Sequence, residues 1–372
     1  MKKERGLTLL EILIATSILV VMVGFLVAIV NSFMGTWQRS YYNSILFAEA
    51  RRVFETIQED LQALAVGSFS HKCRLVGDFD TLGRFRLRLV RPIYHEEGWW
   101  EARKSGQHLL ADKYIDSDQD IQEASQGRLK PTAGWMEVMY AMDPNPHSLR
   151  LHRIVRTPVG GEGSLLAPRP RPRVWTPFLD NVLYLEFRYW SPWTRSWEIP
   201  LRRMSQEELR GTPLLYWDSQ RKGEQPPIQG QFPIFRPPQH LLDHPVLPEK
   251  VMVILVLRRP DWKPDAVVLA EDIGPNSLRI PLSAVGKVPQ EGTDFRFVRL
   301  SSSGGKEPQN SVEWVHYSKV VGSSLVLENA LYRGARGTQP IAHLAGTSVE
   351  VGKTFCFVIS LMGTASNIEE QR

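Results

Sequence analysis

The stretch KKERGLTLLEILIATSILVVMVG, residues 2–24, decides how this chain folds, because it opens a long apolar segment with an acid at its start. From Ile12 to Gln38 the chain has no charged residue, and about 20 apolar residues in a helix cross a bilayer. Glu11 directly precedes that segment. A carboxylate inside a bilayer costs roughly 2.5–3.5 kcal/mol and is kept where it is used, as a rule beside an opposite charge. The sequence therefore predicts a membrane-spanning helix whose first residues include a functional acid.

A helical pattern continues beyond the membrane segment. Apolar residues recur at helical spacing, and they are Trp37, Tyr41, Ile45, Ala48, Val53, Ile57, Leu61 and Leu64. Charged residues from Arg39 to Asp60 lie between them and are expected to face solvent. Gly67 offers a C-terminal stop. We therefore predict one helix over residues 7–66, about 90 Å long at 1.5 Å per residue, with about residues 7–36 in the membrane.

After Gly67 the pattern changes from helical to alternating, which is typical of strands. RFRLRLV, residues 84–90, places Arg84, Arg86 and Arg88 on one face, which is expected to be the solvent face. Further segments rich in β-branched and aromatic residues are also predicted strands, and they are residues 135–142, 148–155, 181–190, 249–259 and 352–361. The predicted fold class is α+β, with the long N-terminal helix packed on an antiparallel β-sheet domain.

Residues 261–351 have an alternating pattern of their own, carried by DFRFVRL, EWVHYSKVV and SSLVLEN. We interpret them as a small β module inserted before the final strand. The β-sheet domain then comprises residues 67–260 plus 352–363. Exposed hairpin tips tolerate insertions, so the module is either an elaboration without a function of its own or a partner-binding surface.

Composition argues against a nucleic-acid partner. The 372 residues include 45 Lys and Arg against 40 Asp and Glu, a formal net charge of +5, and both signs are scattered along the chain. A nucleic-acid-binding protein gathers its basic residues on one surface. The densest basic stretch, residues 169–173, has its arginines between prolines, which is typical of a stiff connector.

No segment carries a complete catalytic or metal-binding motif. His95 begins a run like HExxH, but Trp99 stands where the second histidine is required. Residues 116–120 alternate carboxylates as calcium loops do, but Ile121 occupies the glycine position and Gly127 the place of the final glutamate. A solvated acidic loop and an atypical calcium site remain the alternatives there. We expect no enzymatic activity and no cofactor.

The basic leader ending in Gly6, followed by LTLLE, resembles the class III leader of type IV pilins and pseudopilins. In that family a prepilin peptidase cuts after the glycine, on the cytoplasmic face, and methylates the new N-terminal amine. The resemblance implies loss of residues 1–6, cleavage of the Gly6–Leu7 bond and N-methylation of Leu7. It also implies that Glu11 pairs with the Leu7 amine of a neighbouring subunit during assembly. Leu7 departs from the phenylalanine that is most common at this position.

Two other interpretations of the N-terminus explain less. A secretory signal peptide has an apolar stretch of about 7–15 residues followed by a cleavage site, and the apolar segment here is longer. A plain membrane anchor, with basic residues held on the cytoplasmic side, leaves Gly6 and Glu11 without a role.

A narrower resemblance lies in the strands. The residues that carry it are Phe187, Arg188, Tyr189, Trp193, Trp197, Leu247 and Pro248. Their order is similar to that of the J-type minor pseudopilins of type II secretion systems, over roughly residues 1–70 and 130–260. The proline-dense segment 202–246 and the insertion 261–351 depart from that pattern.

The J-type resemblance implies a role at the tip of the periplasmic pseudopilus, which the subunit helps to form and prime. Implied partners are the prepilin peptidase, I- and K-type minor pseudopilins, the major pseudopilin and the inner membrane. The chain would cross the bacterial inner membrane once, with its C-terminal domain in the periplasm. The alternative is a W-like minor pilin of a type IV pilus, acting in pilus assembly, adhesion or DNA uptake.

The chain has two cysteines, Cys73 and Cys356. Outside the inner membrane the envelope is oxidising, so a disulfide between them would clamp the two ends of the globular domain. The alternative is a free Cys356 buried in the final strand between Phe355 and Phe357.

Overall fold

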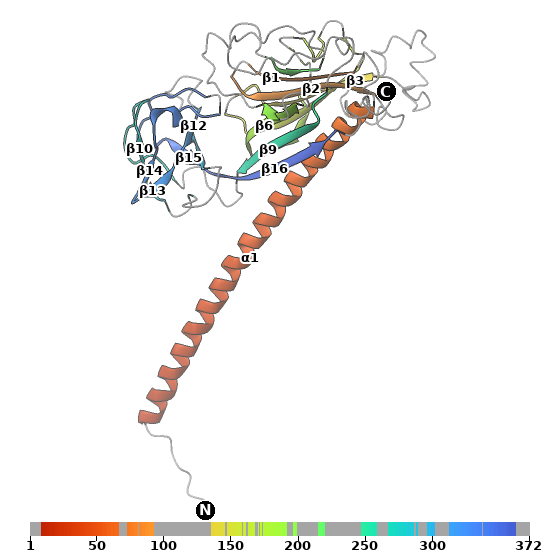
Figure 1. Ribbon diagram of the computed structural model, residues 1–372. Coiled ribbons are helices and arrows are strands. Elements are labelled where there is room, and N and C mark those ends of the chain that lie inside the picture. The colour runs from red at the N-terminus through yellow and green to blue at the C-terminus, as the bar shows by residue number, and fades with distance from the viewer. Residues whose placement is uncertain are drawn as a thin grey trace, which may run out of the picture. The chain divides into compact units, whose positions relative to one another are not determined.

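Helix α1 spans Leu9–Val66, and antiparallel sheets follow it along the chain (Figure 1). The computed structural model describes residues 9–66, 73–80, 82–92, 135–145, 147–157, 159–160, 163–167, 170, 172, 174–191, 196–198, 215–219, 247–258, 267–285, 288, 296–301, 312–336 and 338–361. The chain divides into two units, residues 1–49 and 50–372. The long helix and the antiparallel sheets confirm the predicted α+β class.

Helix α1 is continuous because no proline occurs before Pro92 and its residues keep a helical, apolar pattern. Its end at Val66 agrees with the predicted helix over 7–66, and its described part begins at Leu9. Among the described residues, one candidate membrane span is present, within Leu13–Leu64.

A six-stranded sheet has the order β5-β4-β3-β2-β1-β8, with all neighbours antiparallel. Its strands are β1 (Arg74–Phe79), β2 (Phe85–Pro92), β3 (Trp135–Met142), β4 (Leu151–Arg156), β5 (Pro177–Leu179) and β8 (Leu215–Asp218). Strands β2, β3 and β4 confirm the predicted strands at 84–90, 135–142 and 148–155, whereas β1, β5 and β8 were not predicted. The central strands are buried along nearly their whole length, so both faces of this sheet are covered.

A four-stranded sheet has the order β16-β9-β6-β7. Its strands are β6 (Val182–Ser191), β7 (Ser196–Glu198), β9 (Lys250–Arg258) and β16 (Gly352–Ser360). Strands β9 and β16 pair over their full length, from Arg258 opposite Gly352 to Lys250 opposite Ser360. Figure 1 shows β6, β9 and β16 side by side. The chain thus leaves this sheet at Arg258 and re-enters it directly opposite, at Gly352.

Two three-stranded sheets form between Arg258 and Gly352. One has the order β10-β14-β13 and the other β12-β11-β15. Their elements are β10 (Arg279–Pro281), β11 (Phe297–Ser301), β12 (Val312–His316), β13 (Lys319–Val321), β14 (Ser324–Val326), β15 (Ser348–Glu350) and the 3-10 helix η3 (Ala330–Tyr332). We call residues 267–351 the inserted segment.

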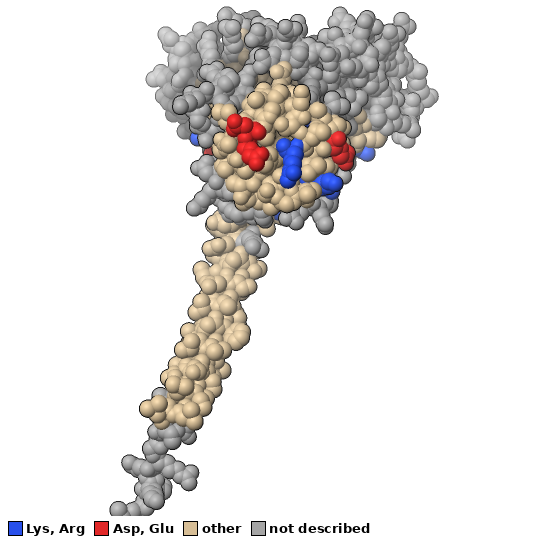
Figure 2. All heavy atoms as spheres, turned by 90° about the vertical axis from the view of Figure 1, so that its left-hand side faces the viewer, with Lys and Arg blue, Asp and Glu red and all other residues tan. Residues whose placement is uncertain are grey.

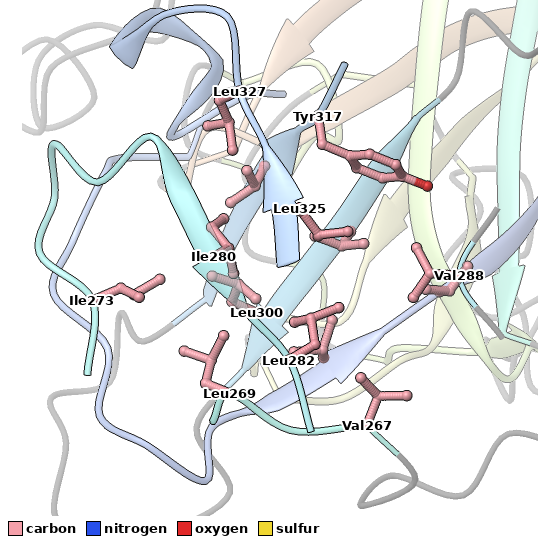
Figure 3. Close-up of a cluster of buried hydrophobic side chains, with 14 residues drawn as sticks. Val267, Leu269, Ile273, Ile280, Leu282, Val288, Leu300, Tyr317, Leu325 and Leu327 are labelled. Carbon is pink, nitrogen blue, oxygen red and sulfur yellow. The ribbon is translucent and has the colours of Figure 1, made fainter. Parts of the chain in front are cut away.

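The inserted segment has its own apolar core. Fourteen buried side chains form it, and they are Val267, Leu269, Ile273, Ile280, Leu282, Val288, Val298, Leu300, Val315, Tyr317, Leu325, Leu327, Val349 and Val351. Figure 3 shows Ile280, Leu300 and Leu325 gathered between strands of both small sheets. All fourteen come from the inserted segment, so burial within it stabilises it as a folded body.

The prediction that the arginines of β2 face solvent is wrong for Arg86 and Arg88. Arg88 is 1% exposed and Arg86 is 9% exposed. Both donate hydrogen bonds to the carboxylate of Asp78, which lies on the neighbouring strand β1, opposite Arg86. Arg88 also donates to the carbonyl oxygens of Leu165 and Ala167, at 2.8 and 2.7 Å. A buried charge needs such partners, and the alternation of the sequence did not reveal that the face is covered.

The predicted disulfide is not formed in the structure, where Cys73 and Cys356 are not joined. Cys73 is fully buried and its thiol contacts the carbonyl oxygen of Leu64 at 3.3 Å. Burial raises the pKa of Cys73 to about 12, so it holds almost no thiolate, the form that exchanges disulfides. Cys356 is exposed on β16, so the predicted burial of a free Cys356 is also wrong.

Candidate membrane and assembly site

Within the first unit, residues 1–49, helix α1 exposes apolar side chains on every side. They are Leu9, Leu10, Leu13, Ile14, Ile18, Leu19, Val20, Val21, Met22, Val23, Phe25, Leu26, Val27, Ile29, Val30, Phe33 and Met34. On the face shown in Figure 2, the described part of this helix segment carries no charged side chain. A helix that is apolar all round is suited to a protein interior or a bilayer. Since these side chains are exposed, lipid is the environment that suits them.

Three hydroxyl groups in this apolar segment donate hydrogen bonds within the helix. Thr16 and Ser17 both donate to the carbonyl oxygen of Leu13, at 3.0 and 2.8 Å, and Thr36 donates to that of Ser32 at 3.0 Å. A polar group left unpaired in hydrocarbon costs several kcal/mol. These internal bonds remove that penalty for Thr16, Ser17 and Thr36, so these three hydroxyls do not oppose insertion.

The predicted assembly acid lies near the start of the described helix. Glu11 is the third residue of α1, two positions after Leu9. Only its backbone is described. Gly6 and Leu7, the predicted cleavage and methylation positions, lie outside the described residues, as does Trp193 of the J-type pattern.

In the second unit, a buried acid fastens the end of α1 to the six-stranded sheet. Asp60 is 1% exposed, so the prediction that it faces solvent is wrong. Arg153 of β4 donates from Nε and Nη2 to its two carboxylate oxygens at 3.0 and 2.9 Å, and Arg91 Nε of β2 lies 2.9 Å from Asp60 Oδ1. Tyr140 of β3 also donates to it. Burial and the Asp60 charge raise the pKa of Tyr140 well above 10, so the phenol keeps the proton that it donates.

Apolar contacts accompany this ion-pair cluster. Val53, Ile57, Leu61 and Leu64 of α1 are each at most 1% exposed. Phe54 stacks on Phe357 of β16 at 4.6 Å between ring centres. A side chain of this size contributes roughly 1.5–3 kcal/mol when fully buried. The last turns of α1 therefore belong to the core of the second unit.

An arginine joins the inserted segment to the four-stranded sheet. The guanidinium carbon of Arg336 lies 4.0 Å from the ring centre of Tyr184 on β6, 4.1 Å from that of Phe297 and 4.4 Å from that of Trp314. Burial lowers the pKa of Arg336 to about 10. We call these three rings the arginine cage. Phe297 and Trp314 belong to the inserted segment, whereas Tyr184 belongs to the four-stranded sheet. The arginine cage therefore joins the inserted segment to that sheet.

The loop that presents Arg336 is itself held by a buried glutamate. Glu313 accepts hydrogen bonds from Arg333 Nε at 2.6 Å and from the backbone amides of Gly334 and Ile341 at 2.8 and 3.1 Å, and His343 Nε2 lies 3.1 Å away. Gly334 has a φ of +60°, which favours glycine. This cluster is closed to solvent and fixes the segment between η3 and β15.

Within the described part of the chain, no group of three or more His, Cys, Asp or Glu side chains is arranged to hold a metal ion. The acidic stretch at 116–120 and the run that begins at His95 lie outside the described residues.

Sequence reasoning missed Asp60, Glu313 and Arg336 as structural charges. Asp60 lies between Glu59 and Leu61, and helical spacing places it at the edge of the apolar stripe of α1. That position was the available signal that Asp60 is buried. For Arg336 the only local signal was the turn-like sequence RGARG. Nothing local identifies its ring partners, which are 22 to 152 residues away.

No protein-family model, curated protein or solved structure matches this chain.

Proposed function

We propose that this protein is a structural subunit of a pilin-like filament, specifically a J-type minor pseudopilin that helps form and prime the tip of a type II secretion pseudopilus. The proposal starts from one observation. A leader ending in Gly6 precedes a helix that has Glu11 as its third described residue and that exposes apolar side chains on every side from Leu9 to Met34. That helix continues without a break into a β-rich unit.

Each part has a role in this proposal. The prepilin peptidase removes residues 1–6 and methylates the Leu7 amine. The apolar segment holds the subunit in the inner membrane, with the C-terminal domain in the periplasm, until assembly. Glu11 pairs with the Leu7 amine of the neighbouring subunit, which offsets the penalty of keeping a carboxylate in an apolar environment. The β-rich unit contacts I- and K-type partners.

The first test is the N-terminus of protein extracted from membranes. We expect a chain that starts at N-methylated Leu7, measured by N-terminal sequencing and intact mass. A chain that starts at Met1 contradicts the proposal. A chain cut after a later small residue identifies a secretory signal peptide instead.

The second test separates assembly from processing. We expect Glu11→Gln to be cleaved normally and to be lost from sheared filaments. Glu59→Gln is the matched control, because Glu59 is an exposed acid on the same helix, and it should assemble as wild type does. Co-purification with I- and K-type pseudopilins supports the type II assignment, whereas co-purification with type IV pilus components identifies the W-like minor pilin.

A further inference from the structure

Two aromatic side chains stand at the end of the apolar segment of α1. Trp37 and Tyr41 are four residues apart and stack on each other, with ring centres 5.7 Å apart and an interplanar angle of 12°. They are 59% and 54% exposed. Such rings have an apolar body and a polar N–H or O–H, which suits the boundary between hydrocarbon and water.

The pair lies where the helix changes from an apolar to a charged sequence. No Trp or Tyr precedes Trp37, and Arg39 is the first charged residue after Glu11. From Arg39 onward charged residues recur along the helix. The rings therefore occupy the outer end of the apolar segment, at the position that interfacial aromatic residues take in membrane proteins.

The helix geometry then determines where Glu11 lies. Between Glu11 and Trp37 the helix rises by about 39 Å at 1.5 Å per residue, whereas the hydrocarbon layer is about 30 Å thick. With Trp37 at the outer boundary of an upright helix, the inner boundary falls at about residue 17. If the helix tilts by about 40°, the separation of Glu11 and Trp37 along the membrane normal falls to about 30 Å. Glu11 therefore still reaches the inner boundary.

We propose that the Trp37–Tyr41 pair binds the headgroup region of the outer leaflet and sets the depth of the helix, so that Glu11 lies at the inner headgroup boundary and not within hydrocarbon. This inference rests on the membrane-anchored helix of the proposed function. It places the Gly6–Leu7 bond on the cytoplasmic side, within reach of a peptidase there. It also means that Glu11 enters an apolar environment only when the subunit leaves the membrane.

The experiment measures depth in the full-length chain. The protein is reconstituted into vesicles of phosphatidylethanolamine and phosphatidylglycerol in a Cys356→Ser background. Cys73 is retained because it is fully buried. A single new cysteine, introduced by Ser40→Cys or by Ala15→Cys, carries a fluorescent reporter. Its quenching by lipids with a nitroxide on the headgroup is compared with quenching by lipids with a nitroxide at mid-chain.

We expect headgroup quenching to dominate at both reporters in the otherwise unchanged helix. In the double variant Trp37→Leu/Tyr41→Leu the headgroup-to-chain ratio at position 40 should fall by about twofold or more, as the outer anchor is lost. The matched control is Phe25→Leu/Phe33→Leu, because both phenylalanines are exposed aromatic residues of the same segment without a polar atom. This control should leave the ratio unchanged.

The outcomes distinguish the two proposals. If alkaline carbonate extracts the wild-type chain from the vesicles, both the membrane anchor and this inference are wrong. If the chain stays inserted but Trp37→Leu/Tyr41→Leu leaves the ratio at position 40 unchanged, only this inference is wrong. Cross-linking of two copies of the Ser40→Cys variant through the new thiol, without headgroup quenching, also overturns it, since the rings would then face a second helix.

Discussion

Arg153 donates hydrogen bonds to both carboxylate oxygens of Asp60, at 3.0 and 2.9 Å, and so joins the last turns of α1 to strand β4, 93 residues further along the chain. Both side chains are buried. A buried ion pair contributes little relative to a well-packed apolar pair, but loss of one partner leaves the other charge unpaired. The pair therefore makes the attachment of the helix sensitive to single substitutions.

We expect Asp60→Asn to lower the free energy of unfolding by about 3–5 kcal/mol, because Arg153 and Arg91 keep their charges in a buried place. The measurement is denaturant unfolding of the full-length chain in detergent, followed by near-ultraviolet circular dichroism. Glu55→Gln is the control. Glu55 pairs with Arg51 on the exposed side of the same helix, and its loss should not shift the midpoint. Equal midpoints for Asp60→Asn and wild type would show that the cluster does not hold the helix.

The arginine cage should be needed for docking of the inserted segment. We expect Arg336→Ala to lower the free energy of unfolding by about 2 kcal/mol, the scale of a desolvated cation–π contact. Arg336 has a φ of +54°, and alanine has the same backbone strain there. The difference in unfolding free energy between Arg336→Ala and wild type therefore measures the loss of the side chain. Arg336→Lys should rescue only part of the loss, because an ammonium does not stack as a planar guanidinium does.

A double-mutant cycle with Tyr184→Leu checks that assignment. Coupling between the two substitutions is expected because the Arg336 guanidinium touches the Tyr184 ring. Arg279→Ala is the control, since Arg279 is exposed on β10. Additive effects of Arg336→Ala and Tyr184→Leu would contradict a direct contact between the inserted segment and β6.

Gly77 of β1 is required because Tyr189 lies over it. A Cβ built at Gly77 would overlap the phenol oxygen of Tyr189 and lie 2.5 Å from its Cζ. The ring has little room to retreat, because Trp217 stacks on it with 5.6 Å between ring centres. We expect Gly77→Ala to lower the free energy of unfolding by about 1–3 kcal/mol, the usual result of overpacking.

Gly274→Ala is the matched control for that prediction. A Cβ at Gly274 meets only the Ser277 hydroxyl oxygen, at 3.8 Å. Thermal unfolding of both variants in the same detergent measures the difference. A Gly77→Ala midpoint no lower than that of Gly274→Ala would show that the contact between β1 and β6 adjusts without loss.

The inserted segment should lose stability in acid through Glu313. Burial raises the pKa of Glu313, but hydrogen bonds from Arg333 and His343 and the Arg333 charge outweigh it and hold the pKa below its ordinary value of 4.5. The unfolded chain therefore binds the proton first, so the contribution of Glu313 is complete above pH 4.5 and is lost as the pH falls through its depressed folded value.

We expect Glu313→Gln to be less stable than wild type at neutral pH and to show a shallower loss of stability below about pH 4.5. The free energy of unfolding, measured at several pH values, reports this slope. Glu271→Gln, which removes an exposed carboxylate of the same segment, should retain the wild-type slope. A Glu313→Gln variant with the wild-type slope would place the acid-sensitive group elsewhere.

Local pattern was sufficient for the elements themselves. The charge-free run from Ile12 to Gln38 and the helical spacing that follows it predicted α1 to its last residue. Alternation predicted β2, β3 and β9. These features depend on side chains a few positions apart, which a sequence displays directly. The short strands β5, β7 and β8, of three or four residues, have too few positions to show a period.

What covers each face was decided only by the tertiary structure. The alternation of β2 grouped Arg86 with Arg88 correctly but did not show that Asp78 of β1 accepts from both of them in a buried layer. Asp60 was assigned to solvent for the same reason, since its partners Tyr140 and Arg153 come from β3 and β4.

The sequence by itself thus determined a long helix, apolar all round at its start, followed by antiparallel strands. The tertiary structure decided which charges are buried, that the two cysteines are not joined, and that Arg336 enters a cage of rings from two parts of the chain. The physical reason is the range of the interactions. Periodicity is set by neighbours along the chain, whereas burial of a charge depends on a partner that only folding brings within hydrogen-bond distance.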